Sequence, residues 1–406
     1  MRRYVSNSLQ LARAWYGGIG RTAVIYPTAF LVAVALGLMS LGLVFHASER
    51  FGASATEVGW LAGAWSLCYV VGCFAIRPRF EHVLPRYVIL VAMAIMFALA
   101  LGIRMAPSLG WVFVLYALHG LTVSNFWPPL MGWLSTDVEG AVLGRVVSRF
   151  NVSWCLGNIV SPYLAGWLSA RDLRLPLLVG ALIFLAASIF VAGATLAMGR
   201  ASAETSSGKP PPENPAAPLT DHSTCLRYPS WVGLFPTYFA TGVLLSIFPL
   251  IGAEQLHLSK PDIGRLLLVR GLFNGLAFVA LGRLAFWHFR RAPMLAGQAV
   301  VTAAFVGLAY AQGNAAISVL LAIVGLGAGI SYSASIFHGV SGSRNRAARM
   351  AVHEAVLSAG LVFGSGTGGM IYQSIGAAAL YWTCAGLLGA GLLVQSVQCA
   401  VMCDGE

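Results

Sequence analysis

Long apolar runs alternate with short polar gaps along the whole chain. A helix that crosses the hydrocarbon core of a bilayer needs about 20 mostly apolar residues. The candidate runs lie at 24–45, 58–76, 86–103, 110–132, 146–168, 175–198, 231–253, 263–283, 293–311, 316–339, 350–372 and 377–401. The eighth and eleventh of these runs also carry charges, so the pattern predicts ten to twelve membrane spans. We therefore expect an all-α polytopic membrane protein.

One polar stretch, 199–230, separates the sixth run from the seventh. It contains Lys209 followed by the prolines 210–212. A segment of this composition cannot bury a core, and its prolines favour an extended linker. The predicted organisation is an amino-terminal segment 1–23, a first six-helix bundle 24–198, the linker 199–230, a second six-helix bundle 231–401 and a tail 402–406.

Basic residues fall unevenly in the gaps between the runs, and this asymmetry indicates orientation. Cytoplasmic loops of membrane proteins carry an excess of arginine and lysine. With a cytoplasmic amino terminus, 18 of the 25 basic residues lie inside, six lie outside and Arg270 falls within a span. An even number of spans places both termini on one side. We expect a multi-pass protein of the cell membrane (the inner membrane in a double-membraned bacterium) with both termini cytoplasmic.

The two halves of the chain resemble each other. Residues 26–28 (Tyr-Pro-Thr) near the start of the first run correspond to 235–237 (Phe-Pro-Thr) near the start of the seventh. In the same order, 57–59 (Glu-Val-Gly) correspond to 262–264 (Asp-Ile-Gly). The matches indicate a duplicated six-helix unit. Because both copies have the same orientation, the repeat predicts a pseudo-twofold axis along the membrane normal.

Small residues recur in the fifth and eleventh runs at a spacing that lets two helices approach closely. The two sets are Gly157, Ser161, Pro162 and Gly166 in the fifth run, and Gly360, Gly364, Gly368 and Gly369 in the eleventh. They resemble the GxxxGPxxGG signature of the major facilitator superfamily. The gap after the second run is similar to the basic loop of that family, with Glu81 at its acidic position. The resemblance implies twelve transmembrane helices in two six-helix bundles around a central cavity.

Composition excludes several classes of protein. The chain is 58% hydrophobic and 10% charged, whereas soluble domains are about 25% charged. A soluble enzyme, a nucleic-acid-binding domain and a disordered chain are therefore excluded. The seven cysteines form no CxxC pair, and no cluster has the spacing of a metal site. Lys209 is followed by proline, so no Walker phosphate loop is present. We expect no metal, no cofactor and no ATP-driven step.

Arg270 is the first candidate for binding a solute. It lies seven residues into the eighth run, about 10 Å from the outer boundary. An ionisable group in lipid costs roughly 2.5–3.5 kcal/mol on insertion scales, so an arginine at this depth needs a partner. Arg270 could hold an anionic or hydrogen-bonding group of a solute, helped by Asn274 one turn away, or it could pair with the protein itself. Further candidates for the lining are Asn125, Trp65, Tyr332 and His119.

Glu354 is the acidic residue that lies clearly inside a predicted span. Burial disfavours the charged form of a carboxyl group, so Glu354, with His353 beside it, is a candidate proton carrier. It could instead form a cytoplasmic gate with Arg149, which lies at a comparable depth in the fifth run, or a static structural pair. We group Glu81 with these coupling or gating candidates.

The sequence predicts a secondary active transporter that moves a small organic solute by alternating access, with proton coupling as one option. The partners are then the solute, protons and the lipid bilayer, without nucleic acid, and we expect a monomer. A membrane-embedded enzyme would need a nucleophile–base or metal constellation, and the polar residues are scattered over many spans. A receptor or scaffold that transports nothing is the other alternative.

Overall fold

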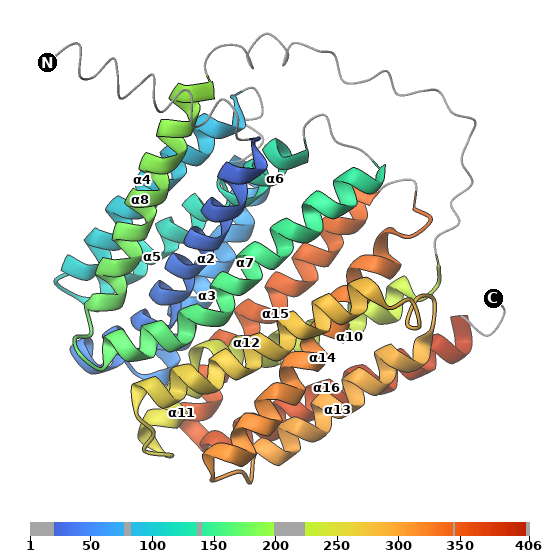
Figure 1. Ribbon diagram of the computed structural model, residues 1–406. Helices are drawn as coiled ribbons and strands as arrows, with labels where there is room; N and C mark the ends of the chain where they lie inside the picture. The colour runs from blue at the N-terminus through green and yellow to red at the C-terminus, as the bar shows by residue number, and fades with distance from the viewer. Residues whose placement is uncertain (1–19, 77–82, 136–139, 199–223, 344–345, 403–406) are drawn as a thin grey trace, which may run out of the picture.

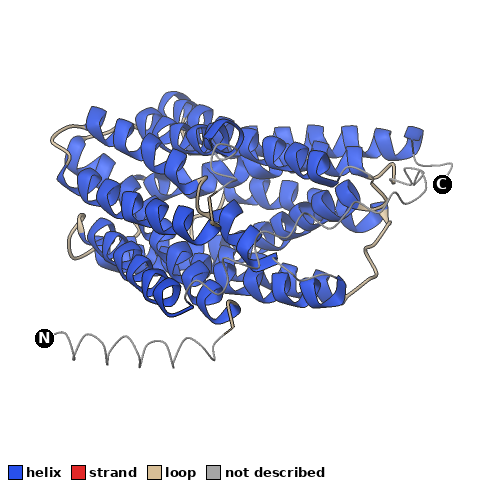
Figure 2. Cartoon of the chain, turned by 90° about the horizontal axis from the view of Figure 1, so that it is seen from above, coloured by secondary structure: helices blue, strands red, loops and turns tan. Residues whose placement is uncertain are grey.

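The computed structural model describes residues 20–76, 83–135, 140–198, 224–343 and 346–402. Within these ranges the chain forms helices and no strands (Figures 1 and 2). The helices of the first half are α2 (Thr22–Phe45), α3 (Ala55–Val71), α4 (Pro85–Met105), α5 (Leu109–Val123), α6 (Trp127–Ser135), α7 (Gly140–Ser169) and α8 (Leu175–Met198). Those of the second half are α10 (Arg227–Ser246), α11 (Phe248–Glu254), α12 (Lys260–Arg283), α13 (Arg291–Leu308), α14 (Asn314–Val340), α15 (Arg346–Ile375) and α16 (Ala377–Met402).

These helices account for the predicted membrane spans. Ten described helices are long and apolar enough to cross a bilayer, and the bent pair α10–α11 makes eleven. The 30-residue α7 does not pass that test, yet it runs between α2 and α12 along the whole molecule (Figure 1). Its polar residues, among them Asn151 and Asn158, line an internal cavity. The all-helical fold in two bundles is therefore confirmed, and these helices make twelve spans when α5–α6 and α10–α11 each count as one.

Two of the predicted runs are broken helices. A turn at residues 124–126 separates α5 from α6, and a bend of 42° separates α10 from α11. Proline explains both breaks, because it has no N–H to donate and disfavours helical geometry in the residue before it. Pro128 and Pro129 stand at the start of α6, and Pro249 stands in the first turn of α11.

Helix contacts repeat between the halves. The first half packs α2 on α7, α3 on α5 and α4 on α8, and the second half packs α10 on α15, α12 on α14 and α13 on α16. Each pair in one half is the counterpart of a pair in the other, as the pseudo-twofold requires. The halves meet where α3 packs on α15 and where α7 packs on α12, and Figure 1 shows the blue-green half against the yellow-red half along α7 and α12.

The same helix cap opens α3 and α12, the two helices that correspond in the repeat. The Ser54 hydroxyl accepts a hydrogen bond from the backbone N–H of Glu57, and the Ser259 hydroxyl accepts one from that of Asp262, both at 3.3 Å. A serine cap satisfies one of the N–H groups that a helix start leaves free, and an acidic residue in the first turn complements the helix dipole. We call the end of the molecule where α3 and α12 begin the capped end, and the opposite end, where α2 begins and α16 ends, the terminal end.

The limits of the predicted segments stay a prediction. Most of the amino-terminal segment 1–23, most of the linker 199–230 and most of the tail 402–406 lie outside the described residues, as does Glu81.

Candidate solute-binding cavity

A cavity of about 1060 Å³ lies between the two halves. Its lining comes from α2, α3, α5, α6 and α7 of the first half and from α10, α12, α14 and α15 of the second. Small-molecule sites usually enclose about 300–1,000 Å³, so this space is large enough for an organic solute. Of the sequence candidates, Trp65, His119, Arg270, Asn274, Tyr332 and Glu354 line it.

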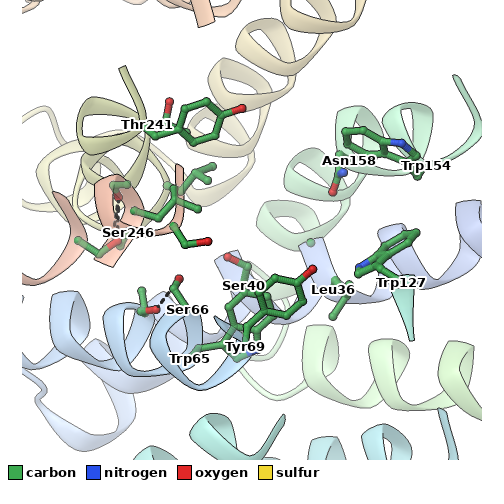
Figure 3. Close-up of a pocket in the computed structure, with 18 of the residues that line it drawn as sticks. Leu36, Ser40, Trp65, Ser66, Tyr69, Trp127, Trp154, Asn158, Thr241 and Ser246 are labelled. Atoms are coloured by element: carbon green, nitrogen blue, oxygen red, sulfur yellow. Dashed lines mark hydrogen bonds between the residues drawn. The ribbon is translucent and has the colours of Figure 1, made fainter. Parts of the chain in front are cut away.

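The first half supplies an aromatic wall. The ring of Trp65 stacks on Tyr69, with centroids 5.8 Å apart and planes within 4° of parallel, and it also faces Tyr116 at 6.1 Å. The Trp65 indole N–H donates to Nδ1 of the fully buried His119 at 3.1 Å. This bond makes Nδ1 of His119 the acceptor nitrogen and fixes the orientation of the indole. Figure 3 shows Trp65 and Tyr69 together on one side of the cavity, with Trp127 and Trp154 further along it.

The second half supplies the charged wall. Arg270 is half-buried, and no described residue makes a hydrogen bond or ion pair with its side chain, whose Nε is fully covered. Its backbone is fixed by helix packing, because a side chain at Gly325 of α14 would collide with the Arg270 carbonyl oxygen. Asn274 follows one turn later on α12 and also lines the cavity. Arg270 therefore offers unused hydrogen-bond donors next to the cavity.

Glu354 and His353 are adjacent in the sequence, but Glu354 faces the cavity and His353 is buried between helices. The Glu354 side chain is accessible from the cavity, and Tyr69, Tyr238 and Tyr332 are near enough to interact with it electrostatically. His353 is fully buried, where its Nδ1 lies 2.8 Å from the Ser335 hydroxyl. Its ring packs edge-on against Tyr332 at 5.0 Å. His353 therefore positions Tyr332 and does not itself line the cavity.

Two further candidates stand apart from the cavity lining. Asn125 lies in the turn between α5 and α6, where its amide donates to the Leu121 carbonyl at 3.3 Å and to the Ser124 hydroxyl at 3.2 Å. Arg149 is exposed on α7, and no described residue pairs with it. Arg149 and Glu354 are thus not an ion pair in this structure.

At the capped end the two halves touch backbone to backbone. A side chain at Gly264 of α12 would collide with Pro162 of α7, and one at Gly166 would collide with the backbone of Lys260. On the other pair of helices, a side chain at Gly59 of α3 would collide with the backbone of Ser365 of α15. One at Gly369 of α15 would collide with the backbone of Ala55. These close approaches require glycine, because any Cβ would push the helices apart.

Two polar contacts reinforce the capped end. The Lys260 ammonium lies 2.8 Å from the Glu49 carboxylate, and the backbone N–H of Thr56 donates to the Gln373 side chain at 3.1 Å. Glu49 reaches across because α2 continues beyond Phe45 as a π-helical turn, His46–Arg50. Both contacts join the first half to the second.

The helices separate toward the terminal end. Further along α12, Gly271 faces Ile159 at an ordinary contact distance, and Gly275 faces the side chain of Cys155 instead of the α7 backbone. The cavity lining continues past this point to Phe74 at the end of the second span and to Met350 near the start of α15. The cavity is therefore closed at the capped end and opens toward the terminal end.

The remaining small residues pack helices within one half. A side chain at Gly157 would collide with α2, where Gly37 in turn lies against Ser161. In the second half Gly360, Gly364 and Gly368 face α10 in the same way. Each small-residue motif therefore joins its helix to two neighbours, one in its own half and one in the other.

Comparison with known proteins identifies the family. The sequence pattern of the Major Facilitator Superfamily matches residues 25–338 and 230–398, so nearly the whole chain is covered. This protein belongs to the Major Facilitator Superfamily. Membership points to a membrane transporter and not to an enzyme. A comparison with curated proteins found no match.

Solved structures share the fold of this superfamily member. The nucleoside transporter NupG is 11% identical, with 94% of this chain and 99% of that chain covered and a TM-score of 0.70. A bacterial homolog of the human lysosomal transporter Spinster, in an inward-facing and unoccupied conformation, is 13% identical, with 96% and 95% covered and a TM-score of 0.68. The human organic anion transporter MFSD10 is 14% identical, with 92% and 98% covered and a TM-score of 0.60.

Some residues of this facilitator's cavity are absent from the sequence-based candidates. Tyr238 of α10 also lines the cavity, near enough to both Arg270 and Glu354 to interact with each, and its ring is 6.3 Å from that of Tyr332. A polar aromatic residue two positions after Pro236, in the first span of the second half, is the signal that could have found it. Glu49 and Lys260 stand in equivalent gaps of the two halves, and their opposite charges are the signal that could have indicated their contact.

Proposed function

We propose that this protein is a secondary active transporter that moves a small organic solute across the cell membrane by alternating access. The observation that carries this proposal is the cavity itself, which lies between two related bundles, is closed at one end by direct helix contacts and opens at the other. A rocking motion that separated the glycine contacts at the capped end and closed the terminal end would expose the same residues to the opposite side.

Arg270 and Asn274 are the residues we assign to solute binding, with Trp65 and Tyr332 as aromatic contacts. A charged group within a membrane protein costs several kcal/mol unless it is paired or hydrated, on the order of 2.5–3.5 on insertion scales. Arg270 has no protein partner among the described residues. The guanidinium is therefore left to water or to a solute group in the cavity, which favours binding over a packing role.

We assign coupling to Glu354. Its carboxyl group faces the cavity beside three tyrosines, Tyr69, Tyr238 and Tyr332, and Arg270 is the other charged group of the lining. A carboxyl group that is accessible from one side at a time can carry a proton across together with the solute. Gating is a second role for the same residue, because Arg149 and Glu354 are unpaired while the terminal end is open and could pair when it closes.

We place both termini in the cytoplasm. The excess of basic residues in the gaps at the terminal end supports this orientation, and the cavity then faces the cytoplasm in this structure. The transporter would act as a monomer of two bundles joined by the linker 199–230, with solute, protons and lipid as its partners.

Transport into lipid vesicles tests the proposal. Vesicles containing the purified full-length protein would be offered a mixture of organic acids, nucleosides and amines under an imposed pH gradient, and accumulated solutes measured by mass spectrometry. We expect at least one solute to accumulate in a protein-dependent manner, and Arg270→Ala to lower its accumulation more than tenfold. If no solute accumulated under either direction of the gradient, the receptor or scaffold alternative would replace transport.

A further inference from the structure

The two walls of the cavity differ in chemistry. Among the lining residues that the structure describes, the Asp, Glu, Lys and Arg side chains are Arg270 and Glu354, and both belong to the second half. The first half contributes rings without formal charge, chiefly Trp65, Tyr69 and Trp154. A solute that uses both walls therefore needs an aromatic or otherwise flat apolar part and a charged part.

Arg270 determines the sign of that charged part, because the other charged residue of the lining, Glu354, is assigned to coupling. Its guanidinium presents several N–H donors in a planar fork that matches a carboxylate. Glu354 does not lie within ion-pair distance of it, and no other described acidic residue does. The Asn274 side chain, one turn further along the helix, adds an uncharged amide beside it. An anion bound here would gain charge-assisted hydrogen bonds without displacing an existing partner.

The aromatic wall is already arranged for stacking. Trp65 and Tyr69 are parallel, and the bond from Trp65 to His119 fixes the indole plane before any solute arrives. In Figure 3 these two rings lie on one side of the cavity, opposite Thr241 and Ser246 of α10. Offset stacking of a flat ring on such a surface adds to the effect of burial, and pre-arranged rings lose little side-chain entropy on binding.

We propose that the solute is an aromatic monoanion, a planar ring that carries one carboxylate. The carboxylate binds Arg270 and Asn274 on the second half, and the ring stacks on Trp65 and Tyr69 of the first. The inference rests on the proposed transport function and names its substrate class. It also explains how the solute could couple the two halves, because one molecule would contact both walls.

Binding of four matched probes tests this assignment on the purified full-length protein. Indole-3-propionate, tryptophan and tryptamine share one ring and carry a negative, a zwitterionic and a positive side group, and hexanoate is an anion without a ring. Isothermal titration calorimetry should give the tightest binding for indole-3-propionate. Because charge-assisted pairing and stacking each contribute about 1 kcal/mol, tryptamine and hexanoate should each bind about fivefold more weakly.

Variants separate the two walls. Arg270→Gln should weaken the binding of indole-3-propionate about tenfold or more and should not weaken that of tryptamine, because it removes a positive charge that repels the amine. Arg265→Gln is the control on the same helix, since Arg265 is exposed and pairs with Asp262. Trp65→Leu should weaken the binding of indole-3-propionate and leave that of hexanoate unchanged. Trp111→Leu is the matched control, because it removes an indole that is 56% exposed and lies outside the cavity. Melting temperatures of all variants check that they fold.

Three results would overturn the assignment: tryptophan or tryptamine binding as tightly as indole-3-propionate, an unchanged affinity in Arg270→Gln, or no binding of any indole probe. The transport proposal is judged separately. If a solute of another class accumulates in vesicles and requires Arg270, transport stands and the aromatic-anion assignment fails. If nothing accumulates, transport itself fails.

Discussion

The two ends of the interface between the halves differ in the size of the residues that meet there. At the capped end Gly264 lies against the α7 backbone and Gly59 against the α15 backbone. Halfway along, Ile159 and Cys155 hold α7 away from α12 by the size of their side chains. Residue size along α7 and α12, and not one particular bond, therefore determines which end of the cavity is closed.

The polar contacts at the capped end are weak by comparison. The Glu49 and Lys260 side chains are 43% and 23% exposed, and ion pairs in such positions contribute about 0.2–1 kcal/mol. Polar contacts this weak can be broken when a solute binds one conformation more tightly than the other, because two conformations that differ by a few kcal/mol are both populated. At the terminal end Arg149 and Glu354 are the corresponding opposite charges, and they are unpaired here.

A side chain placed at the capped end should have the largest effect. Gly264→Val would insert two methyl groups against the backbone of Pro162, so the halves could no longer close there. We expect transport to fall more than tenfold, with the protein held open at the capped end, as measured by vesicle uptake. Gly386→Val is the matched control, because no described atom of another helix lies within 4 Å of a Cβ at Gly386, and it should retain uptake. Equal loss in both variants would mean that the glycine contacts have no special role.

Removing the charge at the terminal end should have the next largest effect. If Glu354 carries the proton, Glu354→Gln should abolish the stimulation of uptake by a pH gradient and preserve exchange of solute across the membrane. Uptake with and without the gradient measures this directly. A gradient response that persists in Glu354→Gln would exclude the coupling role.

The gating role of the same residue makes a separate prediction. If Glu354 and Arg149 pair when the terminal end closes, Arg149→Gln should slow exchange a few-fold, and the charge swap Arg149→Glu with Glu354→Arg should restore part of that loss. Exchange rates of the single and double variants form a double-mutant cycle. Purely additive effects would show that the two charges never meet.

The smallest effect is expected for the ion pair at the capped end. Lys260→Gln or Glu49→Gln should shift the balance between conformations by up to about fivefold, since the pair is partly exposed. The double variant should be no worse than either single one. Labelling of the cavity residue Cys155 by a membrane-impermeant thiol reagent from each side reports that balance. A loss of all transport would mean that the pair, and not the glycine contacts, holds this end.

Most of the fold could be predicted from the sequence because hydrophobic length fixes a membrane helix. The run 175–198 coincides with α8, and the run 377–401 ends one residue before α16 does. The breaks after α5 and α10 were not predicted, because prolines are common in membrane helices and only their place in the packed bundle decides whether they bend one.

The sequence predicts how deep a residue lies within a span, but it does not predict which side of the helix the residue faces. Arg270 and Glu354 were chosen because charges within spans are costly, and both line the cavity. Asn125 lies in a turn and His353 faces Ser335, because successive residues of a helix point about 100° apart and the sequence does not say which direction faces the cavity. The contacts at the capped end join residues up to 317 positions apart, so they depend on the tertiary fold.

The most direct test of alternating access is a pair of distance measurements at the two ends of the same molecule. Spin labels at Ala170 and Gln255, both exposed at the capped end, would report its opening, and labels at Tyr87 and Phe289 would report the terminal end. The cysteines to be labelled would be introduced after replacement of the native ones. Double electron–electron resonance would then be recorded in vesicles with and without a transported solute or a pH step. The account predicts that the first distance lengthens as the second shortens. Distances that stay fixed at both ends, or that change in the same direction, would contradict it.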